Sequence, residues 1–217
     1  MEGVRCTLVP LGSVAHADEL YEANSFDSEG RNWTYLAYGP FGTKDEYRRW
    51  VDEAGVSDDP MFFAVVDNKS GGAVGVASYL AIRPSSGSIE VGHINFSPRL
   101  QRTPAATEAM YLMMRTAFDL GYRRYEWRCD ARNERSRNAA QRLGFSFEGI
   151  FRQAAVYKGR NRDTAWYSVT DHEWPALRTA LTQWLDPSNF DAKGEQSTRL
   201  SDLMRSARES ASDHSVT

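Results

Sequence analysis

The sequence is poor in cysteine and contains no long apolar run. Cys6 and Cys129 are the only cysteines among 217 residues, too few for the disulfide framework of a small secreted protein. No stretch is apolar enough to cross a bilayer, and the first residues lack the apolar core of a signal peptide. We therefore expect a cytoplasmic protein with no membrane partner.

Neither sign of charge dominates the chain. Lys and Arg number 26 against 29 Asp and Glu, so the whole molecule offers nucleic acid no overall attraction. Seven arginines lie between Arg123 and Arg142, which is typical of a solvated face. The few Cys and His residues show no metal-ligand spacing. We expect neither a nucleic-acid partner nor a metal.

Hydrophobic periodicity divides most of the chain into strands and helices. The patterns predict helices over 13–24, 43–55, 104–120, 134–143 and 173–185, and the second begins with a capping box, Thr43 with Glu46. Strand-like runs cover 61–67, 73–83, 89–97, 122–129, 145–159 and 164–171, the last two joined by a polar turn at 160–163. We expect one domain, 1–186, then a mobile polar tail, 187–217, with a short helix near 200–208.

The runs 89–97, 104–120 and 122–129 form a strand–helix–strand unit. Such a unit joins two parallel strands by a right-handed crossover, whereas the hairpins on either side are antiparallel. The sequence thus predicts a mixed α/β fold, with a mostly antiparallel central sheet, one parallel crossover and flanking helices. The segment "QRTPAA", residues 101–106, then lies at the carboxyl edge of the sheet, where open α/β sheets bind ligands.

This segment has two interpretations. Thr103 is a favoured N-cap and Pro104 a favoured first helical residue, so ordinary capping explains both. The same helix start, however, presents unpaired N–H groups and a positive dipole end to an anion. Ala105 and Ala106 are small enough to let a phosphate approach the backbone, and Arg102 adds a positive charge.

A second stretch, "NERSRNAAQRLGFSFEG", follows the next strand and lies on the same edge. Asn133 either caps its helix or hydrogen-bonds an amide-bearing ligand. Together with "QRTPAATEAM", this stretch resembles the GNAT superfamily of acetyl-CoA-dependent N-acetyltransferases over roughly residues 61–170. The likeness is greatest to the RimJ/RimL branch, whose members acetylate protein N-terminal residues, aminoacyl-type small molecules or related amines.

The resemblance implies acetyl-CoA as co-substrate and an amine, of a small molecule or a protein N-terminus, as acceptor, in a monomer or a homodimer. Pro104 stands where the family has the first glycine of its pyrophosphate loop, which removes one N–H donor. Pantetheine would contact the main chain of residues 94–96 and the Asn133 side chain. The implied cofactor-binding residues are Ile94, Asn95, Phe96, Gln101, Arg102, Thr103, Pro104, Ala105, Ala106 and Asn133. The departures from the pattern also permit a catalytically silent CoA-binding or regulatory domain.

The resemblance also suggests the acid that protonates the leaving thiolate. Many relatives place a tyrosine seven residues after the asparagine, where this chain has Ala140. The RimJ/RimL branch places a serine three residues after it, which here is Ser136. Tyr157 and Tyr167 are the fallback donors.

The base is open between two residues on the strand before the loop. An attacking amine must lose a proton to a carboxylate or an imidazole, and Glu90 has the spacing of glutamate bases in other GNAT enzymes. Strand alternation places Glu90, Gly92 and Ile94 on one face. His93 has a pKa nearer neutrality, but it faces the other side unless a bulge reverses it. Glu90 could equally be an exposed charge at a strand end.

Aromatic residues before the first expected strand form a further candidate set. They either line an acceptor pocket or belong to the core, and the sequence does not separate the two. The set comprises Trp33, Tyr35, Tyr38 and Phe41.

Overall fold

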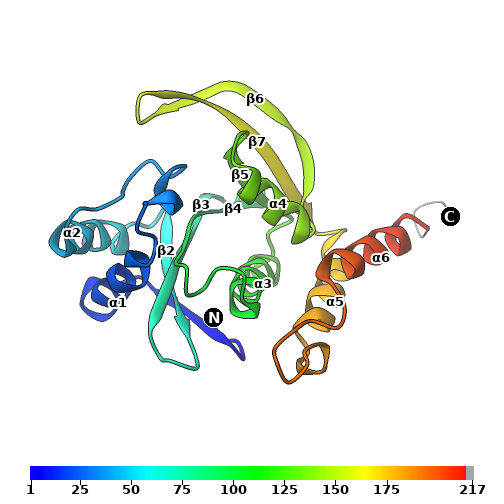
Figure 1. The fold of residues 1–217 in the computed structure, drawn as a ribbon. Helices are drawn as coiled ribbons and strands as arrows, with labels where there is room; N and C mark the ends of the chain where they lie inside the picture. Colours follow the sequence, from blue (N-terminus) through cyan, green and yellow to red (C-terminus); the bar gives the residue numbers. More distant parts are fainter. Residues whose placement is uncertain (214–217) are drawn as a thin grey trace.

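A computed structural model describes residues 1–213 (Figure 1). The strands are β1 Cys6–Pro10, β2 Met61–Asp67, β3 Ala73–Arg83, β4 Ser88–Phe96, β5 Arg124–Asp130, β6 Ser146–Tyr157 and β7 Arg160–Thr170. The helices are α1 Ser13–Ser25, α2 Lys44–Gly55, α3 Pro104–Asp119, α4 Glu134–Arg142, α5 Trp174–Leu185 and α6 Leu200–Asp213, with short 3-10 turns η1 Arg31–Trp33 and η2 Pro187–Asn189. Among these residues no helix is both long and apolar enough to cross a membrane.

The seven strands form one sheet in the order β1-β2-β3-β4-β5-β7-β6. Only β4 and β5 are parallel, and α3 connects them. The predicted fold class is therefore confirmed. The sequence did not predict β1, a five-residue edge strand that ends in Pro10 and pairs with β2, because so short a run carries little periodic signal.

Helices cover the two faces of the sheet with separate apolar cores. Ala64 and Val65 are neighbours on β2, yet they belong to different cores because strand side chains alternate between faces. The first core lies against α3 and α5, and the second lies against α1 and α2. Figure 1 shows α1 and α2 together at one end of the sheet and α3 near its centre.

A bulge in β4 decides which side chains face the second core. Gly92 pairs with Ser78 and Asn95 pairs with Val76, so two residues, His93 and Ile94, oppose a single residue of β3. His93 has a φ of 50°, and its ring contacts the second core while Ile94 packs against the first. The sequence placed Glu90, Gly92 and Ile94 on one face, and this is wrong for Ile94. Because of the bulge, His93 points to the same face as Glu90.

The β6–β7 hairpin turns earlier than the sequence suggested. Lys158 and Gly159 occupy the turn with φ values of 49° and 70°, the left-handed geometry of a two-residue hairpin loop. The expected turn at 160–163 is wrong, because these polar residues continue as strand, with Arg162 opposite Ala155. Arg162 therefore belongs to the sheet.

The segment after residue 186 packs more closely than its composition suggested. Leu200 and Met204 are buried in the first core, and α6 extends to Asp213, past the expected 200–208. Asn189 ties the preceding loop down by donating to the carbonyl oxygens of Trp184 and Thr198. This packing differs from the mobile tail expected over 187–217, whose residues 214–217 lie outside the described part of the chain, and the domain boundary at residue 186 stays a prediction.

Candidate active site

The parallel strands β4 and β5 separate halfway along their length. Their register pairs Ser88–Val91 with Arg124–Trp127 and ends there, so within the described part of the chain residues 92–96 of β4 have no partner on β5. The helices α3 and α4 begin just beyond the carboxyl ends of these two strands. An open strand edge and two helix starts thus meet at one place.

The loop before α3 leaves two backbone donors free. The Thr103 hydroxyl accepts from the N–H of Ala106 at 3.2 Å and donates to the Leu100 carbonyl oxygen at 2.7 Å. Pro104 has no N–H, and the N–H groups of Arg102 and Ala105 have no partner among the described residues. Arg102 is exposed and has a φ of 61°. Capping and anion binding are thus compatible here, through different N–H groups.

Gln101 positions this loop. Its Nε2 donates to Asn32 Oδ1 at 2.8 Å and to the Phe96 carbonyl oxygen at 2.7 Å. Asn32 Nδ2 also donates to that oxygen at 3.3 Å. The Phe96 carbonyl oxygen is thereby engaged, and the expected pantetheine contact of the Ile94, Asn95 and Phe96 main chain stays a prediction.

Asn95 is the buried polar residue next to the open edge. It is 2% exposed, and neither its Oδ1 nor its Nδ2 has a partner among the described residues. A buried amide normally binds a protein group, a water or a ligand. The residues at this edge therefore fit an amide-bearing group such as pantetheine.

Asn133 and Ser136 lie in the first turn of α4. Asn133 Oδ1 accepts from the N–H of Ser136 at 3.1 Å, so the residue caps the helix, and its Nδ2 is left to donate elsewhere. Ser136 Oγ accepts from Trp127 Nε1 at 3.0 Å. This bond uses a lone pair of the hydroxyl, and the hydroxyl also hydrogen-bonds the Cys129 thiol.

The two fallback donors are a tyrosine bonded to a carboxylate and a fully buried tyrosine. Tyr157 Oη donates to Asp130 Oδ2 at 2.9 Å, and burial, together with this carboxylate, raises its pKa to about 12. Tyr167 is fully buried and its hydroxyl accepts from Arg137 Nε. Burial also raises the pKa of the Cys129 thiol, against a hydrogen bond with Ser136 that lowers it, so Cys129 is a neutral core residue.

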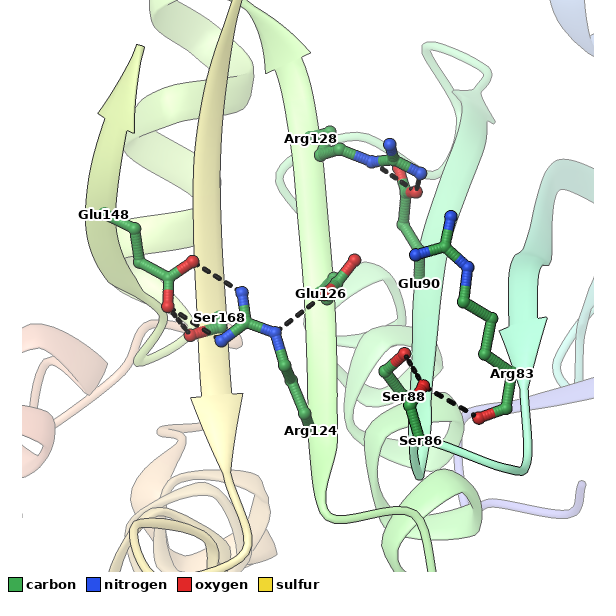
Figure 2. Close-up of polar contacts among 9 residues, drawn as sticks. All are labelled: Arg83, Ser86, Ser88, Glu90, Arg124, Glu126, Arg128, Glu148 and Ser168. Atoms are coloured by element: carbon green, nitrogen blue, oxygen red, sulfur yellow. Dashed lines mark hydrogen bonds and ion pairs between the residues drawn. The ribbon is translucent and has the colours of Figure 1, made fainter. Parts of the chain in front are cut away.

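Glu90 is not an exposed strand-end charge. It is 4% exposed, and Figure 2 shows the Arg128 guanidinium reaching from β5 to one of its carboxylate oxygens. Burial raises the pKa of Glu90, although the hydrogen bond and charge of Arg128 oppose this. Arg124 lies beside this pair, between Glu126 at 2.7 Å and Glu148 at 2.8 Å.

His93 is packed among aromatic rings. Its Nδ1 lies 3.1 Å from Tyr38 Oη, and the two rings stack with centroids 5.6 Å apart. Burial lowers the pKa of His93, and the positive charge of Arg162 lowers it further.

Of the aromatic candidate set, Trp33, Tyr38 and Phe41 pack in or against the second core. Tyr35 instead donates to the Arg132 carbonyl oxygen at 3.1 Å.

The sequence did not single out several residues that contact the site. Trp127, Arg128 and Arg162 bond Ser136, Glu90 and Thr164 respectively, and the alternation of residues along 122–129 was the only signal for the first two. Lys158 was also missed. Its Nζ donates to the carbonyl oxygens of Trp33 and Tyr38, which are distant in the sequence. Within residues 1–213 no group of three or more His, Cys, Asp or Glu residues could hold a metal ion.

A diverging parallel strand pair with a helix start at each strand end defines an α/β fold with an open ligand-binding edge. The chain belongs to the GNAT acetyltransferase family, because the family model of the acetyltransferase (GNAT) domain matches residues 5–146. Members of this family use acetyl-CoA as the acetyl donor.

Solved structures of the family resemble the chain over most of its length. A GCN5-related N-acetyltransferase from Brucella melitensis is 50% identical, with a TM-score of 0.92 over 94% of this chain and 93% of that one. A probable GNAT-family acetyltransferase from Chromobacterium violaceum ATCC 12472 is 44% identical, with a TM-score of 0.75 over 80% and 87%. The microcin C7 self-immunity acetyltransferase MccE, solved with acetyl-CoA and AMP, is 19% identical with a TM-score of 0.68 over 77% and 93%, and supports the fold alone. A comparison with curated protein sequences gives no match.

Proposed function

We propose that the protein moves the acetyl group of acetyl-CoA directly to a primary amine in a ternary complex, as an enzyme of the RimJ/RimL type. The acceptor is a protein N-terminus, an amino acid or an aminoacyl-type small molecule. One observation carries the proposal. A buried carboxylate of raised pKa, Glu90, lies one residue before β4 and β5 separate, and the Ser136 hydroxyl lies in the first turn of α4, beyond the carboxyl end of β5.

The residues of the open edge hold the co-substrate. When bound, acetyl-CoA supplies an activated thioester. The N–H groups of Arg102 and Ala105, with the Arg102 charge, bind the pyrophosphate. The main chain of Ile94, Asn95 and Phe96 and the Nδ2 of Asn133 bind the pantetheine arm.

Glu90 and Ser136 then handle the protons. The amine nitrogen bonds to the acetyl carbonyl carbon, and the carbon–sulfur bond breaks. Glu90 takes the amine proton, directly or through a water, because burial has made it a stronger base than an ordinary glutamate. Ser136 donates a proton or a hydrogen bond to the departing sulfur. His93 is the alternative base, and its lowered pKa keeps it neutral at pH 7.

A turnover assay with a panel of amines tests this proposal. Protein and acetyl-CoA are incubated with amino acids, their amides and short peptides, and thiol release is measured together with the mass of each product. An acetyltransferase releases one thiol for each N-acetyl product. CoA binding by calorimetry with no thiol release from any amine would instead identify the silent CoA-binding domain.

A further inference from the structure

Four arginines, Arg124, Arg128, Arg160 and Arg162, lie on the Glu90 face of β5 and β7, and the first two of them are neutralised, while Arg160 is exposed near the hairpin end. Arg124 is paired with Glu126 and Glu148, and Arg128 is paired with Glu90. Arg162, in contrast, forms no ion pair among the residues whose side chains are described. Its one hydrogen bond from Nε goes to Thr164 Oγ1 at 3.2 Å.

Arg162 lies in the middle of the candidate site. It shares a face of β7 with Thr164 and Trp166, which stand opposite Asp130 and Arg128 of β5. Its guanidinium carbon is 5.9 Å from the centroid of the Tyr157 ring. Burial lowers the pKa of His93, and the charge of Arg162 lowers it further. Burial raises the pKa of Glu90, and the charges of Arg128 and Arg162 oppose this rise.

The carboxylates of Asp130 and Glu90 already bond other donors, although one oxygen of Glu90 stays unbonded. Asp130 accepts from Tyr157 Oη at 2.9 Å and from the N–H of Arg132 at 2.8 Å. Glu90 is held by Arg128. A half-buried guanidinium with unused donors is a strong site for a planar anion, because it offers a carboxylate two parallel hydrogen bonds.

The hairpin that carries Arg162 is also tied to the other wall of the site. Lys158 Nζ donates to the carbonyl oxygens of Trp33 at 2.8 Å and Tyr38 at 3.3 Å, and Tyr38 is stacked on His93. This bridge joins β6–β7 to the segment between α1 and α2. A site bridged in this way favours a small acceptor over a polypeptide chain.

We propose that Arg162 binds a carboxylate of the acceptor, so that the amine acetylated by this protein is a free amino acid or an equally small carboxylate-bearing amine. The proposal rests on the acetyltransferase function proposed above and selects among its acceptors. A peptide N-terminus has its carboxylate several residues away, and an aminoacyl ester or amide has none. Arg162 thus acts in acceptor specificity rather than in proton transfer.

Paired acceptors test the proposal. Each protein amino acid is assayed beside its carboxamide and beside a tripeptide that begins with the same residue, and kcat/KM is measured for each. We expect at least one free amino acid to exceed its amide by on the order of 30- to 100-fold, the size of a lost charge-assisted hydrogen-bond pair. Arg162→Met should remove this preference by lowering kcat/KM for the acid alone, and Arg162→Lys should restore part of it.

The control is Arg160→Met, which changes an exposed arginine two residues away on the same strand and should leave the preference within about three-fold of the wild type. Amides or tripeptides acetylated as well as the free acids by the unchanged protein would overturn the carboxylate proposal and leave the acetyltransferase function standing. CoA binding with no thiol release from any acceptor would overturn both. An acid preference that survives Arg162→Met would also overturn the role of Arg162.

Discussion

Glu90 shows how one buried side chain combines a structural bond with a free reactive atom. Arg128 binds only Oε2, and Oε1 has no hydrogen-bond partner among the described residues. An isolated carboxylate would not stay ionised in so buried a position, and the arginine offsets the desolvation. The bond from Arg128 to Oε2 therefore favours the ionised carboxylate, and Oε1 remains available to an amine.

The first prediction concerns this base. Burial raises the pKa of Glu90 against the opposing charges of Arg128 and Arg162, so wild-type kcat/KM should fall as pH drops through that raised pKa, because a protonated carboxyl group accepts no proton. Glu90→Gln should lower the rate most near neutral pH. The loss should shrink at high pH, where free amine is abundant. A pH profile unchanged by this substitution would transfer the base role to His93.

The second prediction concerns the acid. Ser136→Ala removes the hydroxyl group but leaves the N–H of residue 136 to bond Asn133. We expect kcat to fall by roughly ten- to a thousand-fold with little change in CoA affinity, because the lost interaction forms only as the thiolate departs. Single-turnover kinetics and calorimetry separate the two quantities. Ser201→Ala, at an exposed position of α6, is the control, and normal turnover by Ser136→Ala would pass the role to a tyrosine or to water.

At the scale of elements, the start of α3 offers an anion fewer donors than a glycine-rich loop would. Pro104 contributes no N–H, and Thr103 already bonds that of Ala106. The N–H groups of Arg102 and Ala105 remain, and the exposed Arg102 side chain adds charge. The loop should therefore depend on that charge more than a loop with every donor present.

The third prediction follows from this dependence. Arg102→Glu should weaken CoA binding by on the order of 10- to 100-fold, since it replaces an attraction to pyrophosphate with a repulsion. Arginine and glutamate are both non-glycine residues, so the left-handed φ at position 102 strains the backbone equally in both proteins. Calorimetry with CoA measures the effect, and Arg152→Glu on the exposed part of β6 is the matched control. Equal affinities for all three proteins would contradict a pyrophosphate site here.

The fourth prediction concerns α6. Met204 is 4% exposed and packs in the first core, so Met204→Ala should lower the free energy of unfolding by about 2–4 kcal/mol. Urea unfolding measures this loss, with Ser201→Ala as an exposed control on the same helix. A loss below about 0.5 kcal/mol, the usual size for surface changes, would show that α6 does not stabilise the fold.

At the scale of the whole molecule, local patterns predicted the elements better than their contacts. The capping box of Thr43 and Glu46 involves neighbouring residues, and both of its hydrogen bonds are present. The facing of His93 depends on a bulge against β3, and the turn at Lys158 depends on pairing with β7. The bond from Arg128 to Glu90 joins residues 38 positions apart. Such features are set by strand register, which a single sequence does not specify.

The start of α6 shows a further limit of composition. Leu200 and Met204 are four positions apart and therefore lie on one helix face, yet Ser and charged residues dominate the surrounding segment. Two apolar residues are a weak signal by themselves. They become part of the core only because α5 presents an apolar face to them.

The last prediction joins the site to global stability. A ligand that binds only the folded protein stabilises it by mass action, by about 2.7 kcal/mol at a hundred times its Kd. For a chain of this length that corresponds to a rise in Tm of roughly 5–11 °C. Acetyl-CoA at millimolar concentration should produce this shift in a thermal unfolding experiment.

Two variants separate binding from stability in the same experiment. Arg102→Glu should keep the Tm of the free protein and lose most of the shift, because the change is exposed and lies at the binding loop. Met204→Ala should lower the Tm of the free protein and keep the shift, because α6 supports the fold and not the loop. No shift in the unchanged protein at millimolar acetyl-CoA would remove the main support for the proposed function.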